Sequence, residues 1–149
     1  MKNLFEPGAV EELKSRLSRL TPKSGRQWGK MSPPQMLAHC AAWMELAAGD
    51  TAPPRSLLGY IFGPLAKRSV LKEQPIRRNM PTDKNFIVSD ERDFASERKR
   101  LMAGIERFAG GGPEKCTKHP HSFFGPMTPQ EWARLGYKHL DHHFRQFGV

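Results

Sequence analysis

The sequence is poor in cysteine and contains no long apolar run. Its two cysteines, Cys40 and Cys116, are too few for a disulfide framework and suit a reducing compartment. The first residues carry charge where a secretory signal has an apolar core, and no apolar stretch approaches the ~20 residues of a membrane span. We therefore expect a cytoplasmic protein without membrane contact.

Strand patterns, internal repeats and low-complexity tracts are missing as well. Only residues 85–89 alternate in the manner of a strand, and one short segment cannot build a sheet. A chain of 149 residues is long enough for one domain that buries roughly two-thirds of its unfolded surface without cross-links. We expect residues 1–149 to form a single all-α domain.

Basic residues exceed acidic ones, with 24 Lys and Arg against 15 Asp and Glu, so the formal net charge is +9. This excess attracts anions, which is compatible with an acidic ligand, a phosphate group or nucleic acid as partner. Nucleic-acid binding is not expected, because the sequence has no recognition-helix or zinc-finger signature and no aromatic residues interleaved with the basic ones. One basic run is interpreted as a solvated face or, alternatively, as a means of capturing an acidic substrate or cofactor: Lys67, Arg68, Lys72, Arg77 and Arg78.

Apolar residues at helical spacing, bounded by caps and breaks, predict four or five helices and hence a helical bundle. The expected segments are residues 9–20, 33–49 and 57–71, a fourth helix between a cap at Asp90 or Asp93 and Gly110–Gly112, and a last helix that ends at Gly148. Gly63-Pro64 should interrupt or bend the third segment. Residues 72–90 have no helical period and form a long crossover, either packed on the surface or acting as a lid.

Two capping boxes mark the starts of the second and the last helix. In Ser32-Pro33-Pro34-Gln35 the serine is the expected N-cap and the glutamine closes the box, and Thr128-Pro129-Gln130-Glu131 repeats the pattern. Each box has proline at the first helical position, where its missing N–H costs nothing.

Three histidines fall on the inward faces of these two helices. His139 and His143 are four residues apart, so they lie one above the other on the last helix. Their arc comprises Trp132, Leu135, Gly136, His139, His143 and Gln146, with Arg134, Lys138, Asp141 and Arg145 on the other side. His39 belongs to the apolar stripe of the second helix, which comprises Met36, His39, Cys40, Trp43, Leu46 and Ala47. The two tryptophans Trp43 and Trp132 are expected in the core.

Buried imidazoles need partners, and one shared divalent metal ion satisfies all three. From the preference of imidazole, the expected ion is zinc or nickel. The alternative is that each histidine is an ordinary core residue with its own hydrogen bond. An HxxxH pair alone is a weak signal, but two separate helices that both direct histidine inward strengthen it.

Other polar residues have simpler interpretations. Cys40 is expected to fill a small space in the core, because the next helical position points about 100° away from His39, although it could be a soft fourth ligand. His142 could replace His143 as a ligand through i, i+3 spacing or lie at the rim of the pocket. His119 and His121 could line the pocket mouth, but exposed loop histidines usually have no specific role.

Three segments carry a resemblance to a known superfamily: residues 28–40 (WGKMSPPQMLAHC), 124–132 (FGPMTPQEW) and 137–143 (YKHLDHH). Together they resemble a branch of the DinB/YfiT-like superfamily, and the resemblance extends from Lys2 to Val149. It implies a four-helix bundle with up-down-down-up topology, a long crossover before Asp90 and a short extra helix. It also implies a metal triad of His39, His139 and His143. The His-His-Arg-Gly-Gln ending of the superfamily appears here as His142-His143-Phe144-Arg145-Gln146, with the arginine displaced by one residue.

Relatives in that superfamily include thiol-dependent transferases and isomerases that use a low-molecular-weight bacterial thiol. The resemblance therefore implies a metal-dependent transferase or hydrolase that acts on a small molecule, with such a thiol as an optional cofactor and a homodimer as an optional assembly. A non-enzymatic metal- or ligand-binding helical bundle is the alternative, because fold and ligands do not determine the reaction.

Overall fold

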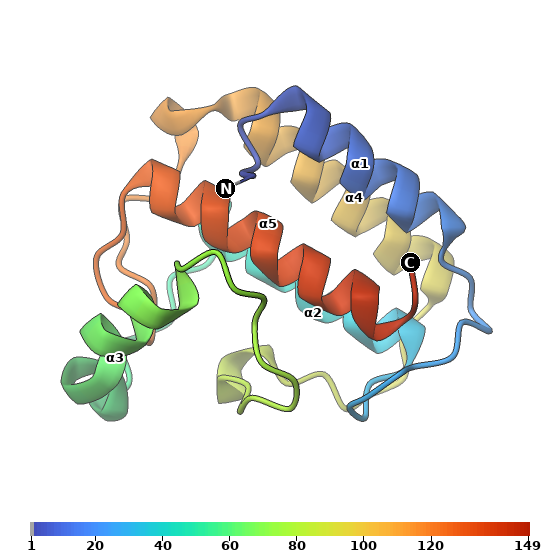
Figure 1. The fold of residues 1–149 in the computed structure, drawn as a ribbon, viewed down its shortest axis with the longest axis horizontal. Coiled ribbons are helices and arrows are strands. Elements are labelled where there is room, and N and C mark those ends of the chain that lie inside the picture. The colour runs from blue at the N-terminus through green and yellow to red at the C-terminus, as the bar shows by residue number, and fades with distance from the viewer. Residues whose placement is uncertain (1) are drawn as a thin grey trace.

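The computed structural model describes residues 2–149, which form five α-helices (Figure 1). These are α1 (Pro7–Arg19), α2 (Pro33–Ala48), α3 (Leu57–Val70), α4 (Phe94–Gly111) and α5 (Pro129–Gln146). Two 3-10 turns, η1 (Lys84–Phe86) and η2 (Pro113–Lys115), lie in the connections. Within residues 2–149 β pairing is limited to one bridge between His121 and Gly125, so the all-α prediction is confirmed. No helix of this described range is long and apolar enough to cross a membrane.

Side-chain pairs show that α2 and α4 run in the same direction. Glu45 on α2 accepts hydrogen bonds from Arg100 Nε at 2.6 Å and Arg100 Nη2 at 2.7 Å. Asp50, just beyond the end of α2, pairs with Arg107 further along α4. Because the residue numbers rise together on both helices, the two are parallel neighbours.

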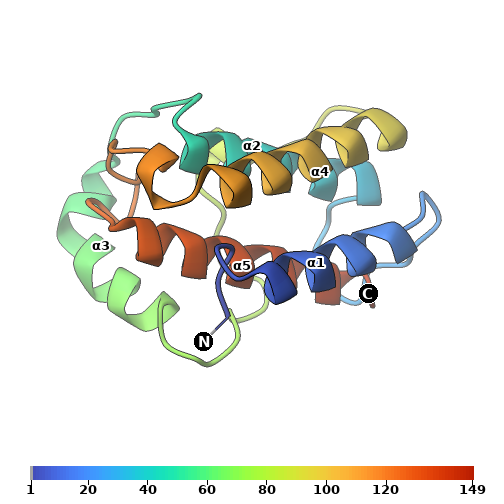
Figure 2. The ribbon, with the colours of Figure 1, turned by 90° about the horizontal axis from the view of Figure 1, so that it is seen from above.

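A second parallel pair is formed by α1 and α5. Tyr137 Oη donates to Glu12 Oε1 at 3.1 Å, and one turn later Arg16 Nη1 lies 2.7 Å from Asp141 Oδ1. The α2–α4 pair stacks on the α1–α5 pair and runs the opposite way (Figure 2). The helices that carry the three histidines, α2 and α5, are therefore antiparallel neighbours in contact.

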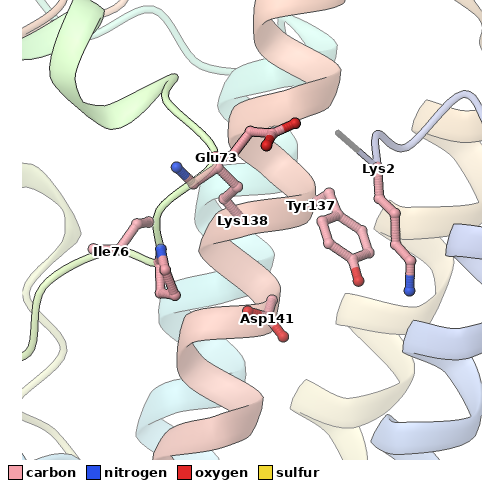
Figure 3. Close-up of a pocket in the computed structure, with 7 residues that line it drawn as sticks. Lys2, Glu73, Ile76, Tyr137, Lys138 and Asp141 are labelled. Carbon is pink, nitrogen blue, oxygen red and sulfur yellow. The ribbon is translucent and has the colours of Figure 1, made fainter.

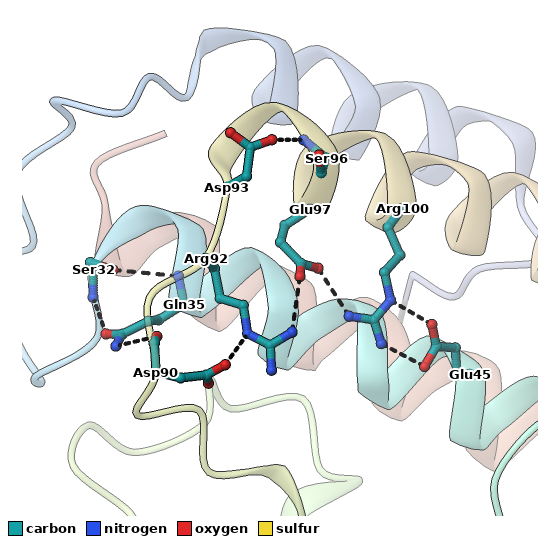
Figure 4. A network of polar contacts seen from close by, with 9 residues as sticks. All are labelled: Ser32, Gln35, Glu45, Asp90, Arg92, Asp93, Ser96, Glu97 and Arg100. Atoms are coloured by element: carbon teal, nitrogen blue, oxygen red, sulfur yellow. Dashed lines mark hydrogen bonds and ion pairs between the residues drawn. The ribbon is translucent and has the colours of Figure 1, made fainter.

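Figure 4 shows how the starts of α2 and α4 are joined. The predicted capping box is present, because Ser32 N donates to Gln35 Oε1 at 3.0 Å and Gln35 N donates to Ser32 Oγ at 3.4 Å. Gln35 Nε2 also donates to the carbonyl of Asp90 at 3.1 Å. The N-cap of α4 is Asp93, whose carboxylate accepts from Ser96 N at 2.8 Å. The crossover thus returns the chain to the end of the molecule where α2 begins.

The core lies between the two helix pairs. Trp43 and Trp132 are both buried, as predicted, with ring centroids 5.7 Å apart. The close approach of α5 to this core depends on Gly136, since a Cβ atom there would lie 2.6 Å from Leu4 Cδ1 and 2.8 Å from Trp43 Cζ3. Every residue of the predicted inward stripe of α2 is buried.

Two helix predictions need correction. Of the two effects expected from Gly63-Pro64, an interruption or a bend, the interruption is absent, because α3 runs continuously from Leu57 to Val70. The last helix ends at Gln146 and not at Gly148, because Phe147 leaves the helical conformation with φ −110° and Gly148 adopts a positive φ of 74°.

Lys138 was expected on the outer side of the last helix, but its side chain is buried under the crossover. Its ammonium group donates to the carbonyls of Val70, Lys72 and Gln74, the last at 2.8 Å. Burial lowers the pKa of Lys138. Three carbonyl acceptors satisfy the three N–H donors of the ammonium group. The start of the crossover is therefore packed on α5.

Candidate metal centre

His39 on α2 and the pair His139 and His143 on α5 meet between the two antiparallel helices. One nitrogen from each ring lies within 4.8 Å of the other two, and His39 Nε2 is 2.9 Å from His139 Nε2. The ring centroids are 4.7–4.9 Å apart. The structure thus brings together the three residues singled out by the sequence, and no other His, Cys, Asp or Glu of residues 2–149 joins the group.

Two of the three histidines are held in one tautomer by a hydrogen bond at Nδ1. The carbonyl of Phe86 in η1 can only accept, so His39 Nδ1, which is 2.8 Å away, carries the proton. His143 Nδ1 donates to Gln146 Oε1 at 2.9 Å, while Nε2 of the same amide donates to Trp28 O at 2.8 Å and so orients the amide. In both rings the Nε2 lone pair is left for the cluster.

His139 lacks this support within the described chain, because its buried Nδ1 has no hydrogen-bond partner there. If Nε2 carries the proton, it donates to His39 Nε2 and the Nδ1 lone pair stays unpaired in the core. If Nδ1 carries the proton, two Nε2 lone pairs face each other at 2.9 Å. A cation bound by both Nε2 atoms removes that repulsion, so the cluster favours a positively charged occupant.

Burial keeps the three imidazoles neutral. It lowers the pKa of His39, against the opposing effect of the hydrogen bond to Phe86, and lowers the pKa of His143 to about 3. The pKa of His139 is held well below its usual range by burial first and then by the neighbouring His143 and His39. Neutral imidazole is the form that binds metal ions, because its lone pair is unprotonated.

The spacing between His39 and His139 suits a transition-metal ion. Two nitrogens bound to one ion at about 2.05 Å lie about 2.9 Å apart at a right angle and about 3.3 Å apart at the tetrahedral angle. The 2.9 Å between the Nε2 atoms of His39 and His139 is at the lower end of that interval. All three nitrogens lie within 4.8 Å of one another, which is wider than that interval. The three histidines therefore have the donor type and protonation state to hold a metal ion, and one pair has the spacing.

The alternative ligands considered from the sequence lie outside this group. Cys40 is fully buried with Sγ 3.7 Å from Met36 Sδ, and burial raises the pKa of its thiol, which disfavours the thiolate that metals bind. His142 turns its ring toward Trp28, at a centroid distance of 5.5 Å. Burial lowers the pKa of His142 as well, against a hydrogen bond to the backbone of Ile76.

His121 is not the exposed loop histidine that the sequence led us to expect. Its side chain is buried, and its Nδ1 accepts from the backbone N–H groups of Phe123 at 3.1 Å and Phe124 at 3.3 Å. Burial lowers the pKa of His121 to about 4. The residue closes the turn before α5 and contributes no atom to the cluster. His119 is half-buried, and its Nδ1 donates to the carbonyl of Pro120 at 2.9 Å.

Two cavities border α5, and neither is lined by a histidine of the cluster. The larger, about 270 Å³, lies between the N-terminal segment and the crossover, with Lys2, Tyr137 and Asp141 among its lining residues (Figure 3). The smaller, about 90 Å³, is lined by His142 together with Trp28, Ile76, Arg78 and Arg145. Because the ring of His142 lies 5.1 Å from that of His143, the smaller cavity is the one next to the cluster.

The residues that orient the histidines were not recognised from the sequence. Gln146 was placed on the same arc as His143, and its position three residues later is the signal that could have identified it as a hydrogen-bond partner. The carbonyls of Phe86 and Trp28 carry no sequence signal, because any residue at those positions supplies the same atom.

Fold and site together define an all-helical protein with a buried cluster of three histidines between two antiparallel helices. The chain belongs to the family described as protein of unknown function (DUF1569), which matches residues 6–148. No curated protein and no solved structure matches it.

Proposed function

We propose that this protein binds one divalent metal ion, zinc or nickel, through His39, His139 and His143. The observation that carries the proposal is the 2.9 Å contact between two Nε2 atoms of neutral buried rings. One tautomer of His139 makes two lone pairs face each other there, and the other leaves its buried Nδ1 unpaired. Hydrogen bonds from Nδ1 of His39 to Phe86 and from Nδ1 of His143 to Gln146 direct the Nε2 lone pairs of these two rings into the cluster. Metal-bound histidines are commonly oriented by such hydrogen bonds at the other ring nitrogen.

The same proposal extends to the fold. The parallel pair α1 and α5, stacked on the parallel pair α2 and α4 that runs the opposite way, supports a four-helix bundle of DinB/YfiT type with up-down-down-up topology. In this assignment α3 is the extra helix within the connection from α2 to α4, although with fourteen residues it is not shorter than α1.

The proposed activity is that of a metal-dependent transferase or hydrolase acting on a small molecule. Three neutral ligands leave the full positive charge on a divalent ion, which stabilises a bound thiolate or hydroxide or polarises a carbonyl. A low-molecular-weight thiol is the proposed optional cofactor. The second candidate is a non-enzymatic metal-binding protein, favoured by the small size of the neighbouring cavity, about 90 Å³.

The walls of that cavity favour an anionic group on the substrate. Arg78 from the crossover and Arg145 from α5 both line it, and the guanidinium of Arg78 lies 4.3 Å from the centroid of the Trp28 ring. A guanidinium binds carboxylate and phosphate oxygens through paired N–H groups. We assign to these two arginines the binding of a carboxylate or phosphate beside the cluster.

Metal content tests the site directly. Protein purified without a polyhistidine tag or chelator should contain one equivalent of zinc or nickel by elemental analysis. His39→Ala and His143→Ala should both lose it, because two imidazoles do not hold the ion as three do. His119→Ala is the matched control, since this histidine lies outside the cluster and should leave the metal content unchanged. Full metal content in either cluster variant would overturn the site.

A thiol-transfer and hydrolysis screen with metal-loaded protein separates the two candidate functions. Turnover that requires the metal and disappears in His143→Ala supports the enzyme. One tightly held equivalent of metal with no turnover across the screen supports the non-enzymatic protein. For an active substrate that carries a carboxylate or phosphate, Arg78→Gln should raise KM with little change in kcat, because the arginine contacts a part of the substrate that does not react.

A further inference from the structure

Helix α3 exposes a continuous apolar face to solvent. Six large apolar side chains on it have exposed fractions between 54% and 83%: Leu57, Leu58, Tyr60, Ile61, Phe62 and Leu65. Leu57, Ile61 and Leu65 follow the spacing i, i+4 and i+8. Leu58 and Phe62 form the adjacent row, so the five residues make one stripe along the helix. The helix lies at one end of the molecule, away from the two helix pairs (Figures 1 and 2).

The opposite face of α3 fixes the orientation of this stripe. Gly59 and Gly63 lie one turn apart against the backbone of Phe123, where an added Cβ would come within 2.7 Å and 2.2 Å of its carbonyl oxygen. Ser56 N donates to Ser122 O at 2.9 Å at the start of the helix, and Lys67 Nζ donates to Pro126 O at 2.9 Å near its end. Contacts at both ends and in the middle prevent α3 from rotating to bury its apolar side chains.

The stripe has the area of a protein–protein interface. At about 200 Å² for a fully exposed side chain of this size, the six residues expose on the order of 800 Å². The largest apolar patch of a typical monomer covers about 300–600 Å², whereas one side of a standard interface covers about 800 Å².

The charges around the stripe favour protein over lipid as its occupant. An interfacial membrane helix carries several free Lys or Arg residues on its polar face. Of the fourteen residues of α3 only Lys67 and Arg68 are charged, and Lys67 is already engaged by Glu131. Arg55, just before the helix, donates to the carbonyl of Gly59 and stacks on the ring of Tyr60 at 4.0 Å. The stripe itself contains no charge, so two copies can face each other without like-charge contact.

We propose that α3 is the interface through which two copies of this chain associate across a two-fold axis. In an antiparallel pairing of α3 with α3 of the partner copy, each apolar stripe covers the other. Antiparallel packing also places the basic C-terminal turn of one helix beside the N-terminal turn of the other, where helix dipoles attract. The interface is independent of the histidine cluster, which is formed within one chain.

Molecular mass in solution tests this interface. By light scattering and sedimentation velocity at micromolar concentration the protein should have twice its monomer mass of 16.9 kDa. Ile61→Glu, in the middle of the stripe, should reduce the mass to 16.9 kDa with an unchanged circular dichroism spectrum. The matched control is Ile87→Glu, the same change at a residue with a similar exposed fraction outside the stripe, 62% against 70%, and it should remain a dimer.

A second variant locates the contact without weakening it. In Ile61→Cys the new thiol is exposed, whereas Cys40 and Cys116 are buried, so mild oxidation should give a covalent dimer through position 61. Ile87→Cys should remain a monomer on a denaturing gel. A parent protein that stays monomeric at 100-fold higher concentration overturns the proposal, as does an Ile61→Glu protein that remains a folded dimer. A monomer that binds vesicles containing anionic phosphatidylglycerol, and loses that binding in Ile61→Glu, assigns the stripe to lipid instead.

Discussion

Replacing Gln146 by leucine should weaken metal binding without touching a metal ligand. Gln146 Oε1 accepts the proton of His143 Nδ1, and its Nε2 donates to the carbonyl of Trp28. In Gln146→Leu the ring of His143 loses the bond that selects its tautomer and orients Nε2. Loss of a hydrogen-bond partner of a metal-binding histidine lowers metal affinity by about 10–100-fold, which corresponds to about 1.4–2.7 kcal/mol of binding free energy. The metal-free protein should also lose about 1–3 kcal/mol of stability, because Nδ1–H of His143 is left buried and unpaired.

The Gln146→Glu variant separates orientation of the ligand from general destabilisation. Its carboxylate still accepts from His143 and makes the imidazole a better ligand, but it cannot donate to Trp28. We expect this variant to lose stability in the metal-free state and yet to bind metal at least as tightly as the parent protein.

Competition against a zinc indicator at neutral pH and fixed ionic strength gives the three dissociation constants. Urea unfolding of chelator-treated protein gives the accompanying stabilities. If Gln146→Leu binds zinc with the parent affinity, Gln146 only anchors the segment around Trp28 and the assigned role in orienting His143 is wrong.

Two further changes test the packing and the titration of buried groups. Trp132→Ala should reduce the unfolding free energy of the metal-free protein by about 3–5 kcal/mol in urea, because its fully buried ring packs on Trp43; a loss below ~1 kcal/mol would contradict that packing. Burial lowers the pKa of His121 to about 4 in the folded protein, whereas in the unfolded chain it has the usual value of about 6.5. Between pH 6.5 and 4 the unfolded chain therefore binds more protons at this residue, and the protein becomes less stable as the pH is lowered. His121→Asn keeps an acceptor for Phe123 and Phe124 but does not titrate. Between pH 6.5 and 4 the variant should therefore lose roughly 3 kcal/mol less unfolding free energy than the parent protein. Urea unfolding of metal-free protein measures both losses, and equal losses in parent and variant would refute the assignment.

Local patterns predicted the helices and the inward positions of the histidines, because both depend on spacing within a helix. The caps at Ser32 and Thr128 are determined by side chains three residues apart, and the structure confirms both. The inward positions of His39 and His143 follow from helical periodicity alone, and both residues are buried.

Predictions of side-chain burial were wrong where the path of a long connection between helices decides whether a side chain is covered. Lys138 is buried because the crossover lies over it, and residues 72–90 have no period from which that path could be derived. His121 is buried because a turn folds back so that two backbone N–H groups reach its ring. The exposed stripe of α3 was also not foreseen, since the apolar pattern of Leu57 to Leu65 is the one that buried helices show.

His39 and His139 are 100 residues apart in the sequence, so an unfolded chain presents at most the local pair on α5. An ion that needs all three rings would bind the native state and hardly the unfolded one, so on the proposed function metal supply would be a determinant of folding. With free metal at 100 times the dissociation constant, the native state gains about 2.7 kcal/mol. For a domain of ordinary stability, that gain changes the fraction of unfolded chains exposed to proteases by about 100-fold. The amount of this protein in a cell would then rise and fall with the supply of the proposed ion.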